Sequence, residues 1–93
     1  MNYYISILVP LASGRWHALF PDLPGCQAEA SDLDLATMHA ARALDHYAET
    51  LNGEIWVAPP PRDLADIKSD DTWSAAHAID WSDSVITMLP LRV

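Results

Sequence analysis

The chain has 93 residues, and 13 acidic against five basic residues give it a formal net charge of −8. This length fits one domain over residues 1–93, which buries roughly two-thirds of its unfolded surface, so we expect further burial in a homo-oligomer, a dimer or a tetramer.

Direct nucleic-acid binding is disfavoured because the cations are scattered, whereas a basic protein partner is favoured. Net acidity is equally compatible with plain solubility. No apolar run approaches the ~20 residues of a membrane span and no signal peptide is recognisable, which predicts a cytoplasmic protein with no membrane contact.

The first thirty residues predict an antiparallel sheet. Residues 3–9 are apolar on both alternating faces, which is typical of a strand covered on both sides. Residues 10–14 interrupt this run and residues 15–20 alternate again, so the two segments are expected to pair as a hairpin. After a proline-rich turn, Cys26, Ala28 and Ala30 alternate with polar residues and predict a short third strand. Cys26 is interpreted as core filler, since no neighbouring His or Lys in the sequence activates it.

One long amphipathic helix is predicted next. Its start is marked either by Ser31, with Asp34 completing a capping-box-like pair, or by Asp32. Asn52 and the glycine that follows it predict its end. The exposed face is expected to carry Asp34, Arg42, Asp45 and Glu49. The apolar stripe facing the sheet consists of Leu33, Ala36, Ala40, Ala43, Leu44, Tyr47 and Leu51.

The second half of the chain is less regular. A brief apolar patch at residues 55–57 precedes three prolines at 59–61, which predict an extended surface connection. Residues 62–68 predict a short helix, residues 73–81 alternate only imperfectly, and residues 84–91 predict a last strand. In that strand Val85, Thr87 and Leu89 share one side, and we expect them to form an oligomer edge.

The sequence predicts no enzyme, no metal site and no cofactor. Two-metal nuclease chemistry requires converging carboxylates, yet residues 3–9 contain none. The pair His39 and His46 stands two helical turns apart, roughly 10 Å, which is too far for one metal ion to bridge. No nucleophile, base and orienting group occur at a usable spacing, so no catalytic residue is assigned.

Tryptophans and aspartates concentrate after the long helix and suggest a partner surface. Trp is favoured at the desolvated centre of protein interfaces, and acidic residues around it suit a basic partner. The alternative is that the tryptophans roof a small core. The candidate partner-binding residues are Trp56, Asp63, Asp66, Asp70, Asp71, Trp73 and Trp81.

The most informative motif is the turn at residues 20–26. It reads Phe20-Pro21-Asp22-Leu23-Pro24-Gly25-Cys26. With the strands before it and the strand, helix and prolines after it, this motif resembles the HicB-like antitoxin family over about residues 3–61. The resemblance implies an α+β, partial ribonuclease-H-like fold, with a three- to four-stranded antiparallel sheet, one main helix on one face, a short second helix and a C-terminal strand.

The resemblance also implies a function. HicB-like proteins are antitoxins of type II toxin–antitoxin modules, so the chain is expected to bind a small basic HicA-type toxin and to cover its mRNA-cleaving active site. Most members carry a C-terminal DNA-binding domain. Here residues 84–90 look like the strand that opens a ribbon-helix-helix, but no helices follow, so we expect no such domain. The alternative is a stand-alone oligomeric regulatory or scaffolding domain with an unrelated partner.

Overall fold

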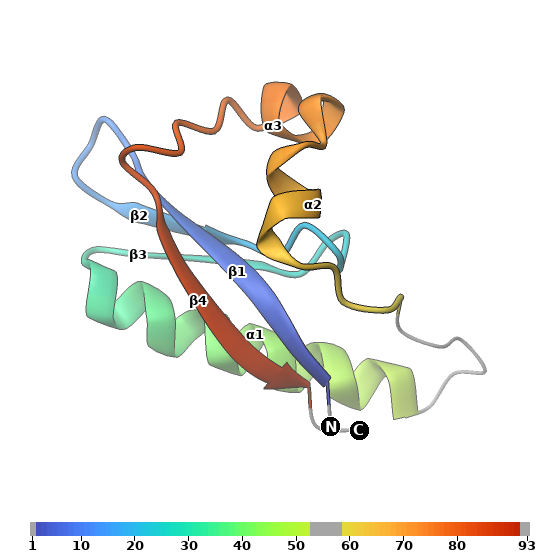
Figure 1. Ribbon diagram of the computed structural model, residues 1–93. Helices are drawn as coiled ribbons and strands as arrows, with labels where there is room; N and C mark the ends of the chain where they lie inside the picture. Colours follow the sequence, from blue (N-terminus) through green and yellow to red (C-terminus); the bar gives the residue numbers. More distant parts are fainter. Residues whose placement is uncertain (1, 53–58, 92–93) are drawn as a thin grey trace.

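A computed structural model describes residues 2–52 and 59–91 of the chain. Four strands form one antiparallel sheet in the order β3-β2-β1-β4: β1 (Asn2–Pro10), β2 (Trp16–Leu19), β3 (Gln27–Ala30) and β4 (Val85–Leu91). The long helix α1 (Leu33–Asn52) covers one face, while the short helices α2 (Leu64–Lys68) and α3 (Asp71–Ala76) lie over the other (Figure 1). The expected α+β fold is therefore confirmed.

The central strand β1 divides the core into two clusters. Tyr4 and Leu8 pack into the cluster with α1, and Ile5 and Ile7 pack into the cluster with α2. Neighbouring residues of a strand point to opposite faces, so a strand covered on both sides is largely apolar. This explains the apolar run at residues 3–9, which was predicted to be a strand of this kind. The buried polar residue Ser6 donates its hydroxyl hydrogen to the Leu19 carbonyl oxygen at 3.3 Å.

Helix α1 begins at a cap provided by Asp32. The Asp32 Oδ1 accepts a hydrogen bond from the backbone N–H of Leu35 at 2.8 Å, and the Asp32 carbonyl accepts one from Ala36 at 2.9 Å. Of the two caps that the sequence left open, Asp32 rather than Ser31 fills the role.

The apolar stripe of α1 lies against the sheet as predicted. Ala36, Ala40 and Leu44 are buried, and so is Ala48, which the predicted stripe omitted. The predicted acidic and basic outer face is exposed. Three small alanines allow the helix axis to approach the strands closely, and α1 packs most extensively against β3. The side chain of Leu51 and the predicted helix stop at residue 53 lie outside the described residues.

The segment after α1 differs in part from the prediction. The prolines at 59–61, expected in an extended surface connection, lie outside any helix or strand and are exposed or half-buried, and the predicted short helix is found as Leu64–Lys68. A further helix, Asp71–Ala76, occupies a stretch to which no element was assigned. This helix buries no residue fully, and its sequence accordingly lacks the apolar stripe by which a helix is recognised. Among the described helices, none is long and apolar enough to cross a bilayer.

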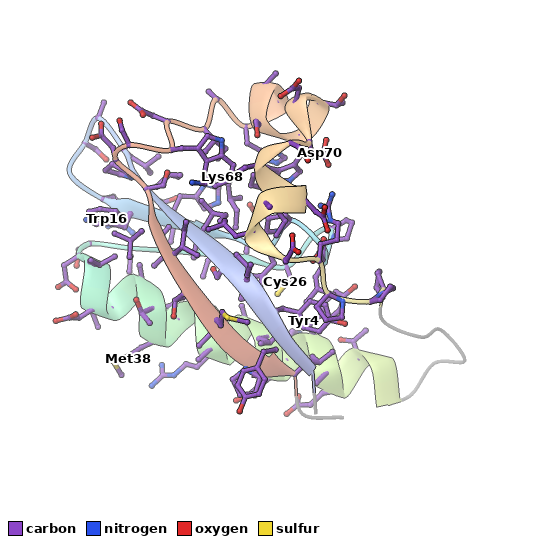
Figure 2. The ribbon with its side chains drawn as sticks, viewed as in Figure 1. Tyr4, Trp16, Cys26, Met38, Lys68 and Asp70 are labelled. Atoms are coloured by element: carbon purple, nitrogen blue, oxygen red, sulfur yellow. The ribbon has the colours of Figure 1, made fainter. Side chains whose placement is uncertain are left out.

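We expect Leu44→Ala to destabilise the domain by about 2–5 kcal/mol, because Leu44 is 1% exposed and its removal leaves a cavity under the sheet. Met38 is a matched control on the same helix. It is 53% exposed and lies on the side of α1 away from the sheet (Figure 2), so Met38→Ala should change stability by less than about 0.5 kcal/mol. Urea unfolding followed by circular dichroism gives both values. Equal losses would contradict the packing described here.

Candidate partner-binding surface

The turn at residues 20–26 is built from two successive hydrogen-bonded turns. The N–H of Leu23 donates to the Phe20 carbonyl at 3.1 Å, and the N–H of Cys26 donates to the Leu23 carbonyl at 3.0 Å. Gly25 has a φ of 88°, a conformation that L side chains rarely adopt, which explains why a glycine stands at this position of the turn. Leu23 is fully buried. The turn is therefore a rigid, anchored feature rather than a loose loop.

Within this turn Asp22 accepts hydrogen bonds from one arginine. The backbone N–H of Arg62 donates to Asp22 Oδ2 at 2.7 Å and its Nε donates to Oδ1. The Asp22 side chain is only 6% exposed, so these charge-assisted bonds offset the cost of burying a carboxylate. The hydrogen bond to Asp22 is the main cause that raises the pKa of Arg62.

Arg62 also contacts the start of α3. Its Nη1 lies 3.1 Å from Asp70 Oδ2, while Asp70 Oδ1 caps α3 by accepting from the backbone N–H of Trp73 at 3.1 Å. The Trp73 N–H and, next, Arg62 lower the pKa of the Asp70 carboxyl. One guanidinium thus joins the turn to the outer helices. We call Arg62, Asp22 and Asp70 the clamp.

Trp73 and Trp81 contribute to the second cluster. Both are partly buried and pack against the cluster formed by Ile5, Ile7 and Ile67. Their rings lie 6.4 Å apart, and the Lys68 ammonium lies 5.6 Å from the Trp81 ring centre. The interpretation that the tryptophans roof a small core therefore applies to both. Trp56, the third candidate, lies outside the described residues.

The candidate aspartates belong to the same outer layer. Asp63 caps α2 by accepting from the N–H of Asp66 at 2.9 Å, as Asp70 caps α3. Asp66 and Asp71 are exposed in the first turns of these helices. The structure brings six of the seven candidate residues onto α2, α3 and their flanks. We call the exposed surface of these elements, which carries the aspartates, the acidic face. That this face binds a partner remains a prediction.

The other candidate residues lie along β4, an edge strand of the sheet. Val85 is 37% exposed, whereas Thr87 and Leu89 are half-buried on the side that faces α1. On the opposite side of the strand Met88 is 59% exposed. The alternation in the sequence correctly placed Val85, Thr87 and Leu89 on one side of the strand. It did not indicate that Met88, on the other side, would be more exposed than any of the three.

The described residues do not form a metal-binding group of three or more His, Cys, Asp or Glu side chains. Cys26 is buried, and this burial raises the pKa of its thiol to about 11. Such a thiol is almost entirely protonated at neutral pH and is a poor nucleophile. Its predicted role as core filler is confirmed by its place in the cluster with α1.

Two solved structures share this architecture. The N-terminal domain of the Burkholderia pseudomallei antitoxin HicB superposes with a TM-score of 0.74 at 15% identity, covering 98% of this chain and 99% of that one. The chain has the fold of that domain. A chain of the HicA3 and HicB3 toxin–antitoxin complex gives a TM-score of 0.67 at 18% identity, with the same coverage of each chain. No protein-family model matches the sequence, and a search of the curated proteins found no match. The fold implied by the resemblance to HicB-like proteins is confirmed.

We expect Arg62→Gln to lower the free energy of unfolding by about 1.5–3 kcal/mol, because Asp22 would keep its burial and lose its charged donor. Arg15→Gln is the matched control. Arg15 Nε lies 2.8 Å from Glu29 Oε1, but both side chains are 47% exposed, and such a pair contributes only about 0–1 kcal/mol. Urea unfolding at constant ionic strength compares the two variants. A larger loss for Arg15→Gln would contradict the assigned role of the clamp.

Proposed function

We propose that this protein is the antitoxin of a type II toxin–antitoxin module and that it neutralises a small basic, HicA-type mRNA-cleaving toxin by covering its active site. The observation that carries this proposal is the likeness in fold, over 98% of the chain, to a HicB N-terminal domain and to a chain of a HicA3–HicB3 complex. The chain performs no chemistry in this proposal. It binds no nucleic acid itself and acts in the cytoplasm.

The charge of the outer layer supports the choice of a basic partner. Residues 63–83 contain six aspartates against one lysine. A toxin that binds RNA must present cations to phosphates, and those cations are complementary to this acidic face. Complementary potentials speed the encounter and orient the two proteins before contact. A toxin held by its RNA-binding face cannot reach its substrate.

The test is titration calorimetry with the purified small basic protein encoded beside the gene, together with an RNA-cleavage assay. We expect tight binding and loss of cleavage. Substituting Asp66→Lys and Asp71→Lys together should weaken binding about tenfold or more at low salt, since both side chains are exposed on the acidic face.

The matched control is the pair Asp34→Lys and Asp45→Lys on the outer face of α1. It changes the net charge equally, and Asp34, like Asp66 and Asp71, lies in the first turn of its helix. This variant should bind nearly as the wild type does. If both double variants weakened binding equally, the effect would come from net charge and not from the acidic face. If the wild-type chain did not bind a folded, active neighbour protein, the antitoxin proposal would be refuted.

A second candidate function is a stand-alone oligomeric regulatory or scaffolding domain with an unrelated partner. The observation that favours it is the place of β4 at the edge of the sheet, where it pairs with β1 alone among the described strands. The strand Val85–Leu91 carries no charge, and it exposes Val85 at its start and Met88 at its centre. An uncharged edge strand is a template for pairing with another chain, and antiparallel pairing of two β4 strands would extend the sheet across both copies.

For this candidate we expect a concentration-dependent dimer, or a tetramer, in light scattering after size exclusion. Met88→Lys should shift the equilibrium toward monomer by about tenfold or more, because it places a charge at the middle of the pairing edge. Met38→Lys adds the same charge to an exposed site on α1 and should leave the equilibrium unchanged. A wild-type chain that stays monomeric at high micromolar concentration would refute pairing through β4.

A further inference from the structure

A groove of about 250 Å³ lies between the turn at residues 20–26 and α3. Its buried lining residues are Leu19, Phe20, Pro21 and Cys26. Exposed Pro24 of the turn and exposed His77, just past the end of α3, line it as well. The volume is below the ~300–1,000 Å³ typical of small-molecule pockets and suits one or two side chains.

The clamp holds the two walls of this groove together. Asp22 belongs to the turn, Asp70 caps α3, and Arg62 donates to both carboxylates. Figure 2 shows Asp70 beside α3 and Cys26 beneath α2 in that view. The walls are about fifty residues apart in the sequence, so the groove exists only when the outer layer is docked. Its shape is therefore set before any partner arrives, which lowers the entropic cost of binding.

The wall on the α3 side has a defined chemistry. The His77 ring lies 4.8 Å from the Trp73 ring, and its Nδ1 lies 3.0 Å from the Trp73 carbonyl oxygen. A carbonyl only accepts, so Nδ1 carries the hydrogen and Nε2 of the neutral ring is left as an acceptor. The wall thus offers an aromatic surface that ends in a hydrogen-bond acceptor. Both residues belong to the segment 63–83, with its six aspartates and one lysine.

We propose that this groove receives an apolar anchor side chain, aliphatic or aromatic, carried on a basic segment of the protein partner. The inference rests on the proposed function and names the site at which the partner is held. An anchor that fills a preformed groove accounts for most of the binding energy in many protein interfaces, and the apolar part of this groove is lined by Leu19, Phe20 and Trp73. Cations that flank the anchor would meet the aspartates of α2 and α3, and a flanking donor would meet Nε2 of His77.

The first test is calorimetric titration of the small basic protein encoded beside the gene into two single variants. His77→Ala removes part of one wall at an exposed site and should weaken binding about tenfold. His46→Ala is the matched control on α1, where the His46 side chain is 83% exposed, and its affinity should stay within about twofold of the wild type. Circular dichroism checks that both variants are folded.

The second test follows the amide signals of the ¹⁵N-labelled wild-type chain while the same basic protein is added. We expect the largest shifts at Gly25, Gln27 and the Trp73 indole. Tight binding with unchanged affinity for His77→Ala and with shifts confined to other surfaces would overturn the groove and leave the antitoxin proposal standing. No binding at all would overturn both. Shifts at the groove that arise on concentrating the labelled chain alone would assign the groove to a second copy and overturn the partner proposed here.

Discussion

The outer layer of the molecule depends on one guanidinium that serves two carboxylates. Helices α2 and α3 have five and six residues, and isolated helices of that length do not persist in water. Among the contacts that hold them over the sheet, fully buried Ile67 packs on β1, and Arg62 joins Asp22 to Asp70. Because the Asp22 carboxylate is nearly buried, moving Arg62 away would leave it without its charged hydrogen-bond donor at a high cost in free energy. The clamp therefore fixes the position of the outer layer, α2 and α3, relative to the turn at residues 20–26.

The two faces of the sheet use different packing. On the α1 face, alanines bring a long helix close to small strand residues, and most residues of the resulting cluster are buried. On the other face, short helices cannot cover as much surface. Trp73 and Trp81 bridge the gap with large rings that stay partly exposed. A large ring contributes to a core through one side and to a surface through the other. The interpretations as core roof and as partner surface are thus compatible on physical grounds.

An element could be predicted from the sequence when the interactions that form it are local in the sequence. The first hairpin, β3 and α1 have periods of 2 and 3.6 residues, which are local signals, and all were predicted. Helix α3 lacks a buried stripe and was missed. The clamp joins residues 40 apart, so Asp22 was recognised as part of a turn motif without its partner. Asp63 and Asp70 each stand three residues before a backbone N–H that they cap, a local pattern that would have identified both short helices.

Charge and shape make separable contributions on the α2–α3 face. The aspartates act over a Debye length, about 8 Å at physiological salt, and their effect on encounter weakens as salt rises. The groove acts only at contact, and the burial of its apolar residues is not screened by salt. An acidic face alone attracts any basic protein, including many that are not partners. The clamp fixes the walls of the groove, so a partner must also carry a matching side chain at one position. We therefore assign specificity to the groove and the speed of association to the charge.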